Sequence, residues 1–356
     1  MSSSSPSLEA FIANTGLTCQ PLALVTSGGT RVPLEKSTVR SVENFSTGAR
    51  GSSSTEAFLK QGYAVIFMYR RGSRMPYLWR LDPTGSVSES ILDNAHASSD
   101  PNCLLFRSAV KSARLYLLPF TDVSEYLSLL KSTLQSMAPR ASLSLYYAAA
   151  AVSDFHLPDL PEHKIQSGTT PGGGPAPRGP ASGASGTHVD EAGRLHVVLS
   201  PVPKLLGELK SWCPGVYVCG FKLETDPEIL AAKATGSLRR YGLDCVVANI
   251  LKTRKEVCWV YTPHGCEELR STELDADIVR AVARMHMDKV RETMDPTYFA
   301  LTVGTKKGLR EKRDRRVWEG MKGWKKSFFW ASEKLGPVLG LCVFYFFKNR
   351  GRFLKN

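Results

Sequence analysis

The sequence lacks the signatures by which many proteins of its size are assigned. Its 356 residues contain neither G-x-G-x-x-G nor G-x-x-x-x-G-K-[ST], so the two commonest glycine-rich nucleotide loops are absent. The eight cysteines include no C-x-x-C or metal-finger spacing, which favours reduced thiols in the cytosol over a disulfide framework. The first 16 residues are serine-rich without a basic n-region or an apolar h-region, so we expect no secretory signal.

A positive charge spread over the whole chain is missing too. Residues 301–356 hold 15 Lys or Arg against 4 Asp or Glu, so this tail carries 11 of the 13 net positive charges. The nearly neutral remainder gives no reason to expect a nucleic-acid partner. An apolar run in the tail, 335–347, has 13 residues, fewer than the roughly 20 that span a bilayer as a helix. We expect a tail that is disordered or that contacts a membrane surface through its aromatic and basic residues.

What the sequence does contain is an alternation of short apolar runs and amphipathic stretches. The apolar runs predict strands at 22–26, 63–69, 115–120, 143–152, 216–221, 245–250 and 256–262. The amphipathic stretches predict helices at 52–61, 204–212, 228–241 and 275–290, and another that begins at Thr121 or Asp122. Residues 70–114 have no clear period, and we interpret them as a long polar excursion. The alternation indicates a Rossmann-like α/β fold: a mainly parallel sheet with helices on both faces and a site at the carboxyl ends of its strands.

The predicted domain organisation has three parts. Residues 1–20 form an N-terminal segment, 21–300 form one domain, and 301–356 form the basic, aromatic tail. A low-complexity loop interrupts the domain at 167–193, and its first 20 residues contain seven glycines and four prolines. We interpret this loop as flexible, and either as a flap or as an inert insertion.

Two clusters of small residues separate the first predicted strand from its helix. They are S-G-G-T at 27–30 and S-T-G-A-R-G at 46–51. Their glycines can bring backbone N–H groups close to an anion, and the helix that follows adds its positive N-terminus. The simpler interpretation is a mobile surface turn without a ligand. A connection of this length inside a domain is usually functional or disordered.

Polar residues also follow three other predicted strands. Asp154 and Lys164 come after the strand at 143–152, Lys222 and Lys233 lie at and beyond the end of the strand at 216–221, and Asn249 closes the strand at 245–250. An aspartate there can instead cap a turn, and a lysine can simply be solvated. No histidine has a third ligand at metal spacing. Each signal is weak by itself, but all of them point to one edge of one sheet.

Seven motifs together carry a resemblance to a known family. The chain resembles eukaryotic phosphopantothenate–cysteine ligase (phosphopantothenoylcysteine synthetase) over about residues 8–295. The motifs are V-T-S-G-G-T-R-V-P-L-E at 25–35, V-R-S-V-E-N-F-S-T-G-A-R-G at 39–51, A-A-A-V-S-D-F at 149–155, P-E-H-K-I-Q-S at 161–167, V-P-K-L-L at 202–206, F-K-L-E-T-D-P at 221–227 and V-V-A-N-I-L at 246–251. The resemblance implies a homodimer that joins 4′-phosphopantothenate to L-cysteine with ATP or CTP and Mg²⁺, ATP being preferred.

The resemblance also implies roles for individual residues. It makes Lys164 the lysine that promotes nucleotidylation, Asn44 the residue that holds the acyl intermediate, and Arg40 a substrate contact reaching from the partner subunit. It makes Lys222 and Lys233 phosphate neutralisers. The nucleotide contacts that it implies are Gly28, Gly29, Ser46, Gly48, Gly51, Ala150, Ala151, Asp154, Phe221 and Asn249.

Two other classes of protein compete with this interpretation. A dehydrogenase is disfavoured because G-x-G-x-x-G is missing and because Tyr69-Arg70-Arg71, rather than an acidic residue, ends the second predicted strand. A non-catalytic, membrane-attached scaffold is suggested only by the tail. The presence of both Asn44 and Lys164 argues against a scaffold.

Overall fold

The computed structural model describes residues 6–17, 19–81, 99–165, 187–189, 194–202 and 207–293. The tail expected at 301–356 and most of the loop expected at 167–193 lie outside these residues. Among the described residues, no helix is both long and apolar enough to cross a membrane.

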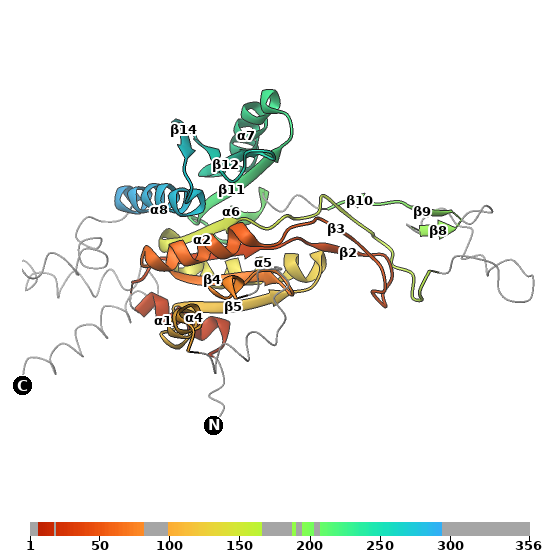
Figure 1. The fold of residues 1–356 in the computed structure, drawn as a ribbon, viewed down its shortest axis with the longest axis horizontal. Helices are drawn as coiled ribbons and strands as arrows, with labels where there is room; N and C mark the ends of the chain where they lie inside the picture. Colours follow the sequence, from red (N-terminus) through yellow and green to blue (C-terminus); the bar gives the residue numbers. More distant parts are fainter. Residues whose placement is uncertain are drawn as a thin grey trace, which may run out of the picture.

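One eight-stranded sheet organises the described part of the chain (Figure 1). Its spatial order is β14 (Gly265–Arg270), β13 (Val257–Thr262), β12 (Cys245–Ile250), β11 (Tyr217–Glu224), β6 (Ser144–Ala148), β1 (Leu22–Ser27), β4 (Ala64–Arg70) and β5 (Leu115–Phe120). The strands from β12 to β5 pair in parallel, and β13 and β14 add an antiparallel hairpin at one edge. The chain runs from β1 towards β5 and later from β6 towards β12, so the order reverses between β1 and β6. Ligands of open α/β sheets bind at such a reversal.

Helices cover both faces of the sheet, as the sequence predicted. One face carries α2 (Ala49–Lys60), α4 (Pro101–Lys111) and α8 (Leu274–Thr293), and the other carries α1 (Leu8–Leu17), α5 (Val123–Met137), α6 (Leu209–Trp212) and α7 (Pro227–Tyr241). Alternate residues of each strand belong to different cores: Ala23 and Val25 pack under α2, and Leu22 and Leu24 pack on the opposite side. Strands buried on both faces read as continuous apolar runs, which made them visible in the sequence.

The predicted N-terminal segment contains α1, which buries Phe11. Two expectations about individual segments were wrong. The described parts of 70–114 are not a polar excursion, because Tyr77, the N-cap of the 3-10 helix η1 (Leu78–Arg80), Leu78 within it and Phe106 of α4 are buried in the core. The strand expected at 143–152 follows the 3-10 helix η2 (Ala138–Leu143) and ends at Ala148, because the next residues leave the sheet to contact the chain after β1.

An extended arm projects from the sheet edge, on the right of Figure 1. It consists of β2 (Arg31–Pro33) and β3 (Ser41–Glu43), residues 155–165 with β7 (Phe155–His156), β8 (Thr187–Val189), and residues 195–202 with β9 (Leu195–Val197) and β10 (Ser200–Pro201). The pairs β2–β3, β7–β10 and β8–β9 are antiparallel. The backbone N–H of Lys36 donates to Pro161 O at 3.0 Å, which ties the hairpin to the second segment. The long connection after β1 therefore forms a hairpin rather than an irregular loop.

Candidate active site

The chain turns sharply after β1 and meets the end of β6. Gly28 has φ +90°, a left-handed conformation that glycine adopts without steric cost. A Cβ atom on Gly29 would lie 1.8 Å from Asn44 O, so only glycine fits against that carbonyl. Ala151 N donates to Gly28 O at 2.8 Å, and Thr30 N donates to Ala151 O at 3.1 Å. The structure thus brings together the glycines after β1, the chain after β6 and the backbone of Asn44.

The second glycine cluster brings the start of α2 against the end of β1. Gly48, the N-cap, has φ +76°; its N–H donates to Ser46 Oγ at 3.3 Å, and its carbonyl accepts from Ser27 Oγ at 3.1 Å. A Cβ atom on Gly51 would lie 2.4 Å from Ser27 Oγ, so this glycine sets how closely α2 approaches β1. The first turn of α2 contains no acidic residue. A helix start of this kind can bind an anion through its backbone N–H groups and its dipole.

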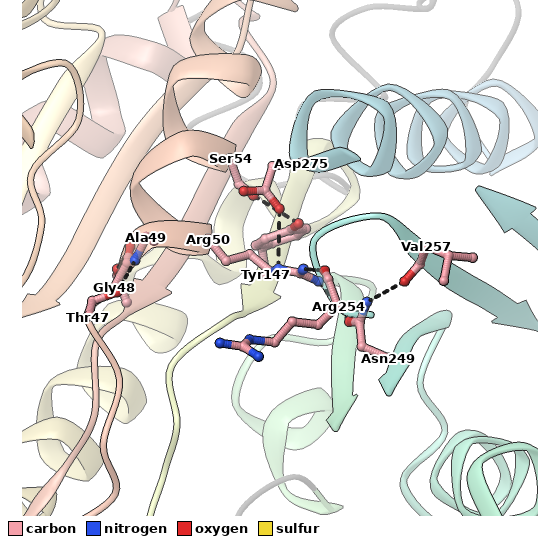
Figure 2. Close-up of polar contacts among 11 residues, drawn as sticks. Thr47, Gly48, Ala49, Arg50, Ser54, Tyr147, Asn249, Arg254, Val257 and Asp275 are labelled. Atoms are coloured by element: carbon pink, nitrogen blue, oxygen red, sulfur yellow. Dashed lines mark hydrogen bonds and ion pairs between the residues drawn. The ribbon is translucent and has the colours of Figure 1, made fainter. Parts of the chain in front are cut away.

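Arg50, in the first turn of α2, reaches across the sheet to the end of β12 (Figure 2). Its Nη1 donates to Asn249 Oδ1 at 2.7 Å, its Nη2 donates to Arg254 O at 2.6 Å, and its Nε lies 3.2 Å from Asp275 Oδ1. The guanidinium also lies over the Phe221 ring, 5.9 Å from its centroid. Neither the sequence pattern nor the family resemblance pointed to Arg50. One sequence feature could have identified it: Arg50 is a cation beside the start of a predicted helix, where the helix dipole favours an acidic residue.

Asn44 lies between the two glycine clusters. Its Nδ2 donates to Val152 O at 3.1 Å, which places the side-chain amide beside the segment from Ala150 to Asp154. Ala150 N in turn donates to the side chain of Thr26 at 3.3 Å. Asp154 is exposed, and its carbonyl oxygen accepts from the backbone of the arm. Its carboxylate therefore lies at the border between the sheet edge and the arm.

Arg40 lies on the arm, away from the glycine clusters. Its Nη1 donates to Glu35 Oε1 at 2.7 Å, and its backbone N–H donates to Glu35 Oε2 at 2.9 Å. Burial by itself would raise the pKa of the Glu35 carboxyl, but the hydrogen bonds from Arg40 and from Ile165 N–H outweigh burial and hold that pKa below its usual value. Four residues of extended chain separate Arg40 from Asn44, which is about 13 Å.

Among the described residues, the three predicted lysines form no hydrogen bond or ion pair with the glycine clusters. Lys164 is exposed on the arm, and Lys222 is half-buried next to Phe221 on β11. Lys233, on α7, pairs with Glu224 at 3.3 Å and keeps half of its side chain exposed. Within the described part of the chain, no group of three or more His, Cys, Asp or Glu side chains could hold a metal ion.

Comparison with known proteins decides the family. No protein-family model matches the chain. It is 38% identical over 284 residues to phosphopantothenate–cysteine ligase 2 of Oryza sativa subsp. japonica, covering 75% of this chain and 81% of the relative. It is 37% identical over 280 residues to the human phosphopantothenate–cysteine ligase, covering 74% and 83%. The chain belongs to the phosphopantothenate–cysteine ligase family.

Solved structures agree with this assignment. A Cab2 variant in complex with phosphopantothenate-cysteine superposes with a TM-score of 0.67 at 35% identity, covering 80% of this chain and 93% of that one. A pantothenate-metabolism flavoprotein from Streptococcus pneumoniae, 20% identical with a TM-score of 0.50, shares the fold. The family predicted from the seven motifs is therefore confirmed, and so is the Rossmann-like fold.

Within this ligase family member, the residues expected at the site fall into two groups. Hydrogen bonds and close approaches among the loops, α2 and the strands connect one group at the sheet edge: Gly28, Gly29, Asn44, Ser46, Gly48, Gly51, Ala150, Ala151, Phe221 and Asn249. The other group, Arg40, Asp154, Lys164, Lys222 and Lys233, lies on the arm or around the edge without such contacts to the first.

Proposed function

We propose that the protein is a phosphopantothenate–cysteine ligase of coenzyme A biosynthesis, acting in the cytosol. It joins 4′-phosphopantothenate to L-cysteine and releases a nucleoside monophosphate and pyrophosphate. The observation that carries the proposal is the meeting of Asn44 with both glycine clusters and the end of β6 at the reversal of strand order. The relatives that bear this activity in their names support the same assignment.

The first half-reaction activates the carboxylate. It attacks the α-phosphate of a nucleoside triphosphate, a P–O bond to pyrophosphate breaks, and an acyl-nucleotidylate forms. The backbone N–H groups at the start of α2 bind phosphate oxygens, and Lys164 follows the phosphate as its charge shifts. Lys222 and Lys233 neutralise further phosphate charge, the latter by leaving its exposed ion pair with Glu224.

Mg²⁺ is part of this proposal as an ion carried on the triphosphate. The described residues offer no cluster of three ligating side chains, which fits an ion held mainly by phosphate oxygens and water. Asp154, an exposed carboxylate at the border of the site, is the residue that would contact it. When bound, Mg²⁺ neutralises charge on the phosphates.

The second half-reaction forms the amide. The amine of cysteine attacks the acyl carbon, negative charge develops on the carbonyl oxygen, and the nucleotide leaves. The Asn44 amide carries two N–H donors, and one of them is bound to Val152 O. The second is available to a carbonyl oxygen as its charge develops, and this is the role that we assign to Asn44.

We further propose a homodimer in which Arg40 serves the site of the partner subunit. Arg40 lies about 13 Å from Asn44 along β3, and its guanidinium is bound to Glu35 on the arm, which supports a role outside the site that contains Asn44. Beside Arg40 and Asn44, Val39, Val42 and Phe45 are exposed by 55%, 43% and 88%. Exposed apolar side chains that gather on one segment favour a surface that another protein covers.

Pyrophosphate release tests the proposed function. With phosphopantothenate alone, ATP should give up to about one pyrophosphate per site, and cysteine should start turnover. ATP should support the higher rate, with CTP as the alternative. A folded protein that releases no pyrophosphate with either triphosphate refutes the ligase. Saturable fluorescence quenching by NAD(P)H, but not by ATP or CTP, would favour a dehydrogenase instead.

A further inference from the structure

Arg50 is held by three different elements and has little freedom left. It pairs with Asp275 at the start of α8, with Asn249 at the end of β12 and with the carbonyl of Arg254 in the turn that follows. Figure 2 shows the guanidinium lying between these groups. A planar guanidinium with fixed donors loses little further entropy when it orients a partner. Arg50 is therefore suited to fix the geometry of a neighbouring group.

The group that Arg50 fixes is the side-chain amide of Asn249. Because a guanidinium only donates hydrogen bonds, the amide edge 2.7 Å from Arg50 Nη1 has to be the oxygen. The other edge, Nδ2, donates to Val257 O at 3.3 Å. Both contacts demand the same orientation, and Asn249 is only 3% exposed. The amide is thus fixed with its NH₂ group turned away from Arg50, and one of its two N–H groups remains available to a ligand.

We infer that Arg50 is a specificity-determining positioning residue, which holds the Asn249 amide so that it donates a hydrogen bond to a ring nitrogen of the nucleotide base. Adenine and cytosine each carry a ring nitrogen acceptor next to an amino group. Hypoxanthine and uracil carry a ring N–H next to an oxygen at the corresponding positions. An N–H donor in a fixed orientation can bind the ring nitrogen of adenine or cytosine. Against hypoxanthine or uracil it faces the ring N–H, so that two buried donors are left without an acceptor. The inference deepens the proposed function, on which it rests.

Phe221 gives the neighbouring surface on which a base can lie. It packs edge-on against Tyr147, with ring centroids 4.8 Å apart, and its own face lies below Arg50. Phe221 and Asn249 belong to adjacent parallel strands, with Phe221 paired to Val247, two residues before Asn249. An aromatic face and an oriented amide on neighbouring strands are what a flat, hydrogen-bonding ring requires.

Equilibrium binding of matched triphosphates tests the inference. The wild-type protein should bind ATP about 10-fold to 100-fold more tightly than ITP, and CTP more tightly than UTP by a similar factor. In Arg50→Met the amide loses its shorter bond and keeps only the 3.3 Å bond to Val257 O, so its orientation is held more weakly and the ATP/ITP and CTP/UTP ratios should fall below about 3-fold. Arg50→Lys, which can still donate to Asn249 Oδ1, should keep an intermediate ratio. Each ratio compares two ligands on one sample, so partial misfolding cancels.

A second variant tests the amide directly. Asn249→Asp presents only acceptors and should bind ITP at least as tightly as ATP. The matched control is Arg280→Met on α8, where an exposed arginine pairs with Asp277 one turn away; both ratios should stay at the wild-type value.

Three results would overturn the inference. One is a wild-type protein that binds ATP and ITP equally, and likewise CTP and UTP. Another is an Arg50→Met protein that binds all four nucleotides more weakly by one common factor, since Arg50 would then act on the triphosphate. The third is an Arg50→Met protein that keeps the wild-type ratios. A protein that shows the expected ratios but releases no pyrophosphate would refute the proposed ligase alone.

Discussion

The sheet edge differs from the part of the arm around Lys164 and Phe45 in how firmly its side chains are held. At the edge, Arg50 and Asn249 are bound to partners from several elements, and Asn249 is almost completely buried. On the arm, Lys164 is exposed, and Phe45 at its base is 88% exposed. A site that is already ordered loses little entropy on binding, whereas exposed groups gain their partners only when a ligand or a second subunit arrives. We infer that the nucleotide half of the site is preformed and the acyl half is completed on binding.

The largest expected effect separates the two half-reactions. Lys164→Gln should abolish pyrophosphate release even without cysteine, because the mobile charge on the arm is needed to form the acyl-nucleotidylate. Asn44→Ala should release up to about one pyrophosphate per site and then stall. Losing one oxyanion donor typically costs about 10²–10³ in rate, which a single-turnover experiment resolves.

These two roles would be refuted if either variant behaved as we expect of the other. An Asn44→Ala protein without a burst, or a Lys164→Gln protein that forms the intermediate at the normal rate, contradicts the assignment. Lys60→Gln is a matched control, because Lys60 is an exposed lysine at the end of α2 that lies away from the glycine clusters. Its burst and its turnover should equal those of the wild type.

A shared site predicts that two inactive proteins can complement one another. After unfolding and reassembly of Arg40→Ala with Asn44→Ala, some dimers pair the intact Asn44 of one subunit with the intact Arg40 of the other. Since half of the dimers are hybrids and each has one intact site, about a quarter of the wild-type activity should return. Hybrid dimers, verified by differently tagged subunits, that show no recovery would place Arg40 and Asn44 in the same subunit's site.

Most of the sheet could be predicted from the sequence because its strands are buried on both faces. Runs such as 22–25 and 245–248 are apolar throughout, so no alternation had to be interpreted. The prediction for 70–114 was wrong because the residues that reach the core, among them Tyr77 and Phe106, are scattered and follow no helical or strand period. Burial there depends on tertiary packing that a local pattern does not record.

The glycine clusters could be located from the sequence, but their partners could not. The glycines mark positive φ at Gly28 and Gly48, and they mark close approach at Gly29 and Gly51, all of which the sequence suggests in general terms. The contact between Arg50 and Asn249 joins residues 199 positions apart. The strand order places β12 two strands beyond β6, and only this order explains how a residue of α2 reaches Asn249 on β12.

Acid should destabilise the sheet core before it affects the arm. Burial lowers the pKa of His286 on α8 to about 4, and the groups facing it are Tyr63, Tyr217, Asp244 and Lys289. Below about pH 6.5 the unfolded chain takes up a proton that the folded chain refuses, so stability falls by up to ~3 kcal/mol as the pH drops towards 4. Urea unfolding at pH 7, 5.5 and 4.5 measures this loss.

The arm loses stability only at a lower pH than the sheet core does. The pKa of Glu35 is held below its usual value, so its contribution to stability is present above about pH 4.5 and is lost only as the pH falls through its lower folded pKa. Hydrogen exchange between pH 6.5 and 4.5 should therefore show weaker protection in α8 and unchanged protection around Arg40. In His286→Gln the loss of stability over this range should be smaller. An equal loss in both proteins would show that another group causes the acid effect.

The smallest expected effect comes from a single methyl group at the sheet edge. Both Gly51 and Gly236 lie inside helices, so alanine should favour the helix at either position by about 0.5–1 kcal/mol. At Gly236 a Cβ atom meets nothing within 4 Å, and Gly236→Ala should raise the melting temperature without changing nucleotide binding.

At Gly51 the Cβ would lie 2.4 Å from Ser27 Oγ and 2.5 Å from Ser27 Cβ, an overlap that costs about 1–3 kcal/mol. Gly51→Ala should therefore lower the melting temperature, and it should weaken ATP binding because α2 has to move away from β1. Adding Ser27→Gly to Gly51→Ala removes both clashing side-chain atoms and should restore part of each loss. A Gly51→Ala protein that melts and binds ATP like Gly236→Ala would show that the start of α2 is not held against β1, and that the nucleotide half of the site is no more ordered than the arm.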